Sequence, residues 1–372
     1  MKFDIKELLS NKMVKTAIIV VMVVILLIIG ISVYFSIKGR RINDYSVLEN
    51  TVLNAAKKYY KENSDRLPKE IGSTSSIDDL TLSADGYMKE MINIAPKEVS
   101  CKAEAFVKNV NGAYSYYVDL DCGDNYNSET LADHILANQP VVTTGDGLYE
   151  NNGDYVYRGE FVNNYLSFAG RIYQIVSVNS DKSITIINST RDKKLDRPSW
   201  DDRYNPDSGY GKNGINDYTV SRIKEFLTDY VNGSAFSDSD RSKLMYQSLC
   251  IGKVGENDKL SRNMECSVTY DNQIIGLLPV SNFDYVSLDS ECTTVSDKSC
   301  QNYNYLSKFD TSWWTLTGAT EKTYRSYVVG YKSSATVSNC SNESYPREVL
   351  RLTNLVGYSS GNGTEMSPFV IK

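Results

Sequence analysis

Seven cysteines are the residues of this chain best suited to chemistry, and two of them lie close together in the stretch "CTTVSDKSC", Cys292 to Cys300. Such a pair can ligate a metal, exchange electrons or form a disulfide. No two cysteines have the CxxC spacing of zinc ribbons or thioredoxin-like motifs, and the single histidine, His134, cannot complete a mixed zinc site. We therefore predict disulfides, no metal and no cofactor, provided that this part of the chain lies outside the cytoplasm.

Local spacing predicts three disulfides. Cys101 and Cys122 bracket two alternating segments around Asn111-Gly112, a dipeptide typical of hairpin turns. Cys292 and Cys300 would close a short loop that contributes about 2.6 kcal/mol in the chain-entropy model. Cys250 with Cys266 makes the third pair, which leaves Cys340 as a free thiol, as an intermolecular link, or as a sign that one pairing is wrong.

Three tryptophans could form a binding surface. Trp313 and Trp314 are adjacent, so in a strand their rings face opposite sides and one of them could be exposed. With Trp200 and nearby tyrosines, an exposed ring could stack on a sugar or contact a protein. The alternative is ordinary packing in the core.

The polar loop 196–217 carries candidate ligands for Ca²⁺. Asp201, Asp202 and Asp207 supply hard oxygen atoms, but they lack EF-hand spacing, and Asp is a common turn residue. A solvated loop is therefore the alternative. We find no acid, base and nucleophile set, with His134 in a short helix as the one histidine, so we predict no enzyme.

An uncharged apolar run spans residues 16–37, long enough as a helix to cross a hydrocarbon core of roughly 30 Å. It predicts an uncleaved signal-anchor with a cytoplasmic tail at 1–15 and an extracellular part at 38–372. Lysines and arginines flank both sides, so charge only slightly favours an internal N-terminus. The seven cysteines all follow the run, which supports this orientation and a location at the cell membrane.

The rest of the chain predicts an α+β protein with two parts. Residues 38–127 contain a helical pattern with Leu48, Val52, Ala55 and Tyr59 on one face, followed by the hairpin. Residues 128–147 form a linker. Residues 148–372 begin with strand-like runs, continue with a helix at 217–233, on which Val220 and Ile223 belong to the buried stripe, and a second helix at 239–249, and end in irregular strands. A net charge of -6 argues against a nucleic-acid partner.

The first part resembles a known family. An apolar helix, then "AAKKYYKEN", "GYMKEM" and a cysteine-bracketed β region resemble the plan of type IV pilins and pseudopilins over residues 16–127. The resemblance implies a filament subunit that associates through its N-terminal helix. However, the junction "NKMVKTAIIV" lacks the prepilin peptidase site of that family, so we expect a pilin-like domain on a permanent anchor.

The second part resembles an extracellular module of Gram-positive gut bacteria. The resembling stretches are "NNYLSFAGRIYQIV", "GINDYTVSRIKEFL", "CTTVSDKSCQNYNYL" and "GNGTEMSPFVIK". That module is similar to the C-type-lectin-like fold shared with formylglycine-generating enzymes. Neither chemistry carries over, because the sugar-site motifs of the lectins and the reactive cysteine pair of the enzymes are not found here.

These observations predict a cell-surface protein whose distal C-type-lectin-like module binds a glycan or a surface protein, for adhesion or recognition, on a pilin-like stalk. A subunit of a type IV pilus-like filament or envelope assembly is the first alternative. An ectoenzyme is the second.

Overall fold

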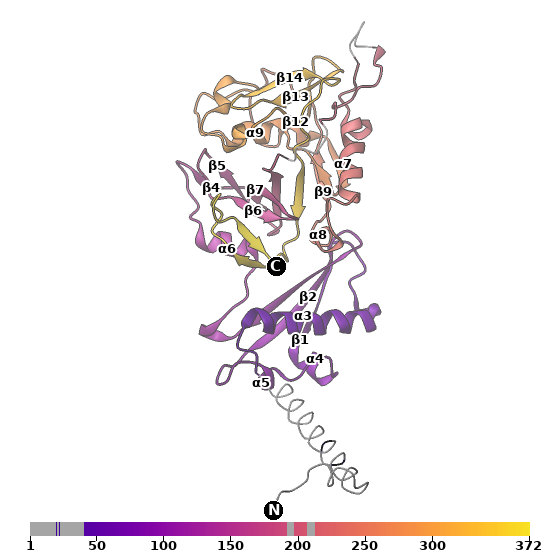
Figure 1. The fold of residues 1–372 in the computed structure, drawn as a ribbon. Helices are drawn as coiled ribbons and strands as arrows, with labels where there is room; N and C mark the ends of the chain where they lie inside the picture. The colour runs from indigo at the N-terminus through magenta and orange to yellow at the C-terminus, as the bar shows by residue number, and fades with distance from the viewer. Residues whose placement is uncertain (1–19, 21, 23–40, 192–196, 207–212) are drawn as a thin grey trace, which may run out of the picture. The chain divides into compact units, whose positions relative to one another are not determined.

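The computed structural model describes residues 20, 22, 41–191, 197–206 and 213–372 (Figure 1). The chain divides into two compact units. Among the described residues, the first holds 41–63, 77–105 and 118–127, and the second holds 64–76, 106–117 and 128–372. Each unit is described by itself.

The long helix of the first unit is α3, Tyr45–Glu62. It begins at Asp44, whose side chain accepts a hydrogen bond from the backbone N–H of Ser46 at 2.9 Å. Its buried side chains recur at helical spacing: Leu48, Glu49, Val52, Ala55, Ala56 and Tyr60. The predicted apolar face is therefore confirmed, although Tyr60 rather than Tyr59 completes it.

Two shorter helices follow, α4 (Asp79–Ala84) and α5 (Met91–Ile94). A three-stranded sheet has the order β1 (Thr74–Asp78), β2 (Lys102–Asn109) and β3 (Tyr114–Asp121), and α3 crosses these strands in Figure 1. The predicted hairpin is confirmed: Gly112 has a φ of 87°, and the N–H of Val110 donates to the carbonyl oxygen of Ala113 at 3.0 Å.

The second unit is organised around a nine-stranded, mostly antiparallel sheet. Its main path runs β11-β15-β8-β7-β6-β17-β16, with β5 paired to β7 and β4 paired to β5. The bounds are β4 Gly147–Asn151, β5 Asp154–Arg158, β6 Tyr165–Phe168, β7 Arg171–Val178, β8 Ile184–Asn188, β11 Ile275–Gly276, β15 Val349–Leu352, β16 Tyr358–Ser360 and β17 Phe369–Ile371. A tight turn joins β7 to β8, and in it the N–H of Asn179 donates to the carbonyl oxygen of Ser183 at 2.8 Å.

Smaller elements surround this sheet. A second sheet contains β12 (Trp313–Gly318), β13 (Arg325–Val329) and β14 (Ala335–Asn339), and a third pairs β9 (Gln247–Cys250) with β10 (Thr269–Gln273). The helices are α6 Leu131–Asn138, α7 Arg222–Asn232, α8 Asp238–Arg241 and α9 Val280–Val286. The 3-10 turns are η1 Ser64–Arg66, η2 Gly123–Asn125, η4 Tyr218–Val220, η5 Met264–Ser267, η6 Lys298–Gln301 and η7 Tyr305–Lys308. The α+β class is therefore confirmed.

Two local predictions for the second unit are wrong. The helix predicted at 239–249 is reduced to the four-residue α8, and the segment continues as strand β9. In this stretch Gln247 and Leu249 are buried while Ser248 is exposed, the two-residue period of a strand. Val220 is 49% exposed because α7 begins only at Arg222, so Val231 joins Ile223 and Leu227 on its buried face.

The prediction of a membrane-spanning helix is corrected. Within the ranges described above, no helix has both the length and the apolar character needed to cross a membrane. The longest of them, α3, has 18 residues and carries charged side chains along its length. Residues 16–37, to which the span was assigned, and the tail predicted at 1–15 lie outside the described residues, except for Val20 and Met22.

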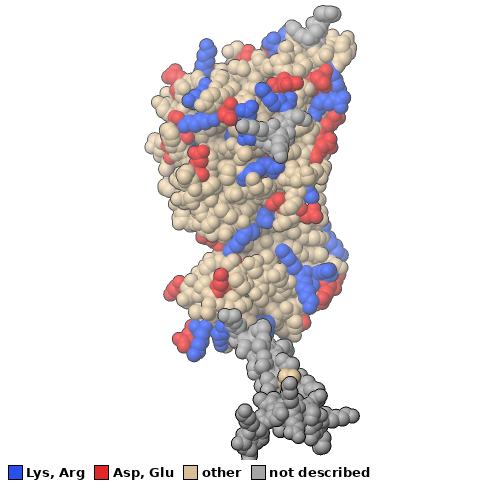
Figure 2. Space-filling view, viewed as in Figure 1, with Lys and Arg blue, Asp and Glu red and all other residues tan. Residues whose placement is uncertain are grey.

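The core of the second unit is rich in large aromatic side chains. Trp200, Trp313, Trp314, Tyr173 and Phe283 are among its fully buried residues. On the face drawn in Figure 2, the side chains of Lys and Arg are interspersed with those of Asp and Glu.

Candidate binding cleft

A cleft of about 220 Å³ opens within the second unit. Strands β5, β7, β8 and β15 of the large sheet supply one wall, and β9 together with the segment leading into α9 supplies the other. Ligand pockets of drug-sized molecules usually exceed roughly 300 Å³, so this cleft suits a smaller group.

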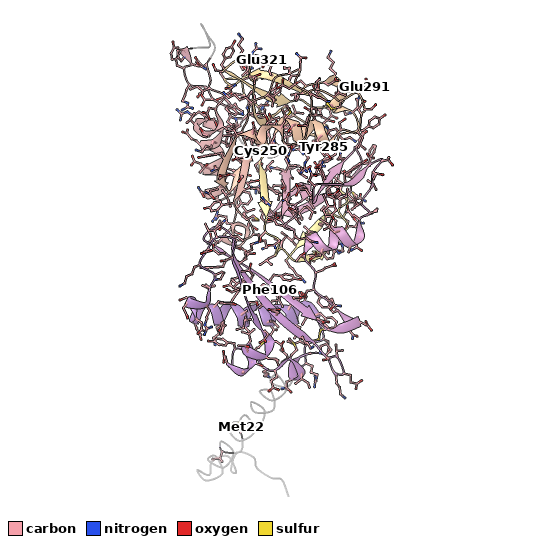
Figure 3. All side chains as sticks on the ribbon, turned by 180° about the vertical axis from the view of Figure 1, so that it is seen from behind. Met22, Phe106, Cys250, Tyr285, Glu291 and Glu321 are labelled. Carbon is pink, nitrogen blue, oxygen red and sulfur yellow. A yellow bond between two sulfur atoms is a disulfide. The ribbon has the colours of Figure 1, made fainter. Side chains whose placement is uncertain are left out.

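Part of the cleft lining is apolar. This part includes Val156, Val176, Leu249, Leu278 and Val349. The disulfide between Cys250 and Cys266 lies in the same lining and joins β9 to η5. Figure 3 labels Cys250 and Tyr285, which both line the cleft. This wall is therefore covalently fixed.

A charged pair sits at the cleft. The guanidinium of Arg262 donates to Asp154 at 3.1 Å, and the N–H of Ser180 donates to the other carboxyl oxygen of Asp154 at 3.0 Å. The Arg262 side chain is only 12% exposed, so the pair is shielded from water. The second arginine of the lining, Arg351, pairs with Asp181 at 3.1 Å. The charges at the cleft are thus neutralised within the protein.

Tyr285 is held in place from both ends. Arg158 lies over its ring at 4.4 Å and donates to its carbonyl oxygen at 2.8 Å. The side-chain amide of Asn151 donates to the Tyr285 hydroxyl at 2.7 Å. The aromatic ring is consequently a rigid part of the cleft wall.

Two asparagines supply hydrogen-bonding groups. Asn263 and Asn282 line the cleft, and within the described part of the chain neither the amide nitrogen of Asn282 nor the side chain of Asn263 has a protein partner. Asn263 has a φ of 60°, a left-handed conformation that Asn tolerates better than most residues. An amide both donates and accepts, so these groups suit hydroxyl-bearing ligands.

The three predicted tryptophans are not part of this cleft. Trp200, Trp313 and Trp314 have no exposed surface, so the predicted stacking platform is corrected to core packing. Trp200 and Trp314 donate their indole N–H to the carbonyl oxygens of Thr315 and Pro198, each at 3.1 Å. The prediction failed because both faces of β12 are buried.

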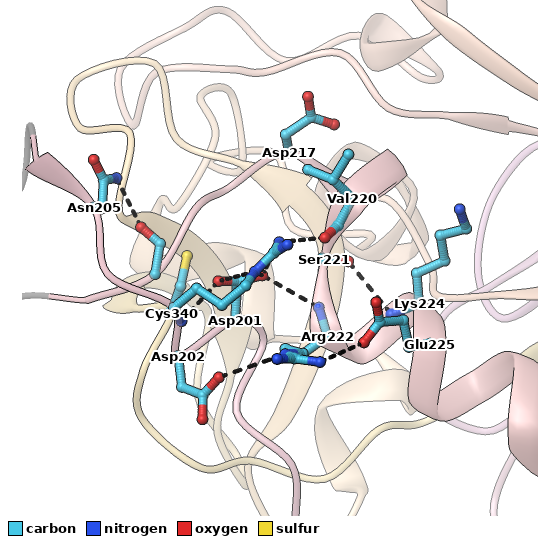
Figure 4. A network of polar contacts seen from close by, with 12 residues as sticks. Asp201, Asp202, Asn205, Asp217, Val220, Ser221, Arg222, Lys224, Glu225 and Cys340 are labelled. Atoms are coloured by element: carbon cyan, nitrogen blue, oxygen red, sulfur yellow. Dashed lines mark hydrogen bonds and ion pairs between the residues drawn. The ribbon is translucent and has the colours of Figure 1, made fainter.

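The two predicted acidic residues that the structure describes, Asp201 and Asp202, each contact an arginine (Figure 4). Asp201 is fully buried and its carboxylate binds the side chain of Arg203 and the N–H of Arg222, which starts α7. Asp202 is exposed and lies 3.9 Å from the guanidinium of Arg222. Asp207 lies outside the described residues. Asp201 therefore holds a loop to a helix, and in the described segments no group of three or more His, Cys, Asp or Glu residues could hold a metal ion.

The disulfide predictions are confirmed. Cys101 is bonded to Cys122, Cys250 to Cys266 and Cys292 to Cys300. Cys340 is free and buried, and burial raises the pKa of its thiol to about 12.

His134 has a structural environment. Its Nδ1 lies 2.7 Å from a carboxyl oxygen of Glu129, and its ring stacks on Tyr358 with centroids 3.5 Å apart. These contacts belong to the packing of α6 and are separate from the cleft lining.

Apart from Cys250 and Cys266, the cleft residues were not predicted. Asp154, Arg262, Asn282 and Tyr285 come from distant segments, and no short spacing in the sequence connects them. Comparisons with protein-family models, with curated proteins and with solved structures found no match to this chain.

Proposed function

We propose that this chain is a binding protein that acts outside the cytoplasm, and that the cleft of the second unit holds one neutral sugar unit of a glycan. The three disulfides support the compartment, because such bonds persist in oxidising surroundings.

The observation that carries the proposal is the internal neutralisation of the cleft. Asp154 and Arg262 pair with each other, so the groups available to a ligand are neutral ones, such as the amides of Asn263 and Asn282 and the hydroxyl of Ser248. A charged ligand would have to break the pair, whereas a sugar hydroxyl can bond to the amides. The apolar side chains of the lining can contact the C–H groups of a sugar ring.

The test is binding of the purified full-length chain to an array of neutral and acidic glycans, followed by calorimetric titration of the best ligand. Asn282→Ala removes one amide, and we expect it to weaken binding by about fivefold to tenfold, the value of one hydrogen bond. Asn342→Ala is the matched control, because Asn342 is exposed and lies outside the cleft.

Three results would overturn the proposal. The first is that no neutral glycan binds. The second is that Asn282→Ala binds the glycan as tightly as the wild type does, and the third is that acidic glycans bind more tightly than neutral ones. Mass spectrometry of the recovered glycan separates binding from hydrolysis, because a binding protein returns it unchanged.

A further inference from the structure

A second and larger hollow lies within the first unit. This groove has a volume of about 750 Å³ and is lined by α4, the start of α5, the beginning of β2 and the end of β3. It is separate from the cleft, so the inference drawn from it does not depend on the proposed function.

The groove is strongly acidic. One basic side chain, Lys102, lines it together with six carboxylates: Asp78, Asp79, Glu90, Glu104, Asp119 and Asp121. The alternation of β2 and β3 exposes Glu104 and Asp119, because Ala103 and Leu120 are buried. Asp79, in contrast, is buried and accepts a hydrogen bond from the N–H of Ala103 at 2.9 Å. The face opposite the core thus concentrates negative charge.

The carboxylates repel one another. The pKa of Asp119 is raised, first by partial burial and then by the charges of Asp121, Glu104 and Glu49. A cation bound in the groove would relieve this repulsion. In the described residues, however, no three such side chains converge on one point that could hold a metal ion. Negative charges spread along a groove fit several separated positive charges better than a single ion.

Exposed apolar side chains line the same groove. Leu80 is 71% exposed and Ile92 is 73% exposed. Solvent exposure of two large aliphatic side chains beside a groove favours an occupant that also brings apolar groups.

We infer that the groove binds a basic, amphipathic peptide segment of a partner protein. The Lys or Arg side chains of this segment pair with Glu104, Asp119 and their neighbours, and its apolar side chains pack on Leu80 and Ile92. Charge complementarity is what selects this occupant.

The probe is a fluorescein-labelled peptide of alternating Lys and Leu, titrated with the full-length chain and followed by anisotropy. A peptide of alternating Glu and Leu is the control ligand. The paired variant Asp119→Asn with Glu104→Gln removes two negative charges while keeping shape. We expect the basic peptide to bind, to weaken as salt increases, and to lose about tenfold in affinity with this variant.

The control variant is Asp271→Asn with Glu343→Gln, which removes the same charge at exposed positions of the second unit. We expect it to stay within about twofold of the wild type. Leu80→Asn should weaken binding without changing its dependence on salt. Thermal unfolding of each variant identifies any loss of fold.

Five outcomes would overturn the inference. The basic peptide does not bind at low salt; the acidic peptide binds equally well; both paired variants weaken binding alike; or Ca²⁺ at low concentration displaces the peptide, which would make the occupant a metal ion. Self-association that disappears only in the groove variant would make the occupant a second copy, and would overturn it as well.

Discussion

Arg347 and Glu348 are adjacent in the chain, are both buried, and are held by opposite ends of Asn188. The Nε of Arg347 donates to the carbonyl oxygen of Asn188 at 2.6 Å. Both carboxyl oxygens of Glu348 accept from the side-chain nitrogen of Asn188 at 2.9 Å. Arg347 also donates to Gln174 on β7 at 3.0 Å. One cluster of hydrogen bonds therefore connects β7 and β8 to the residues that directly precede β15.

This cluster predicts a dependence of stability on pH. Burial raises the pKa of Glu348 to about 7, and the hydrogen bonds from Asn188 oppose the rise. Because this pKa is above that of the unfolded chain, Glu348 contributes stability that is fully present below about pH 4.5 and is lost as the pH rises through about 7. We expect this loss to be on the order of 3 kcal/mol.

The test is Glu348→Gln, followed by urea unfolding from about pH 5 to about pH 8. The variant cannot titrate at this position, so its free energy of unfolding should fall less steeply with pH than that of the wild type. Glu343→Gln, at an exposed position, is the control and should leave the slope unchanged. Parallel curves for Glu348→Gln and the wild type would contradict the prediction.

The thiol of Cys340 gives a second prediction. It is completely buried, and a pKa of about 12 keeps it protonated at neutral pH. A thiol reagent such as Ellman's reagent should therefore find no reactive thiol in the folded protein and one per chain after denaturation without reductant. More than one thiol would mean that a disulfide is not formed, and none would mean that Cys340 is linked between chains.

The cysteines also show what sequence could predict. Each disulfide joins neighbours along the chain, so spacing and hairpin turn signals were enough to pair them. The apolar face of α3 was predictable for the same reason, because its period is local.

The cleft could not be predicted in this way. Asp154 and Arg262 are 108 positions apart, and their pairing depends on the order of strands in the large sheet. The predicted exposure of Trp313 or Trp314 was wrong for a related reason. Only the tertiary packing on both sides of β12 determines that neither ring reaches the surface.

Removal of single disulfides gives a third prediction. In the chain-entropy model, loss of Cys292–Cys300 costs about 2.6 kcal/mol, and loss of Cys250–Cys266, which closes a longer loop, costs about 3.1 kcal/mol. The paired Cys→Ser variants should follow this order in denaturant unfolding. The Cys250 variant should also weaken glycan binding, because its disulfide lies in the cleft lining. Equal binding by both variants would show that this wall does not need its covalent link.

Asp284 gives the last prediction. Its side chain is buried in α9, and neither carboxyl oxygen has a hydrogen-bond partner among the described residues. Burial raises its pKa well above the ordinary value, and the nearby charges of Glu265 and Asp297 raise it further. Since the folded-state pKa exceeds the unfolded one, the wild type loses stability at this position as pH rises above about 4.

Asp284→Asn cannot ionise, so it should gain stability over the wild type by up to about 1.4 kcal/mol per pH unit above about pH 4, until the folded-state pKa is reached. Asp289→Asn is the matched control, and its effect on stability should depend on pH in the opposite direction. The pKa of Asp289 is lowered by the hydrogen bond from Asn302, so its carboxylate adds stability that is present at neutral pH and lost on acidification. The measurement is the free energy of unfolding in urea of both variants and the wild type at several pH values across this range. If Asp284→Asn became less stable than the wild type as the pH rose, the pKa of Asp284 would have to be lowered in the folded protein, and the prediction would be wrong.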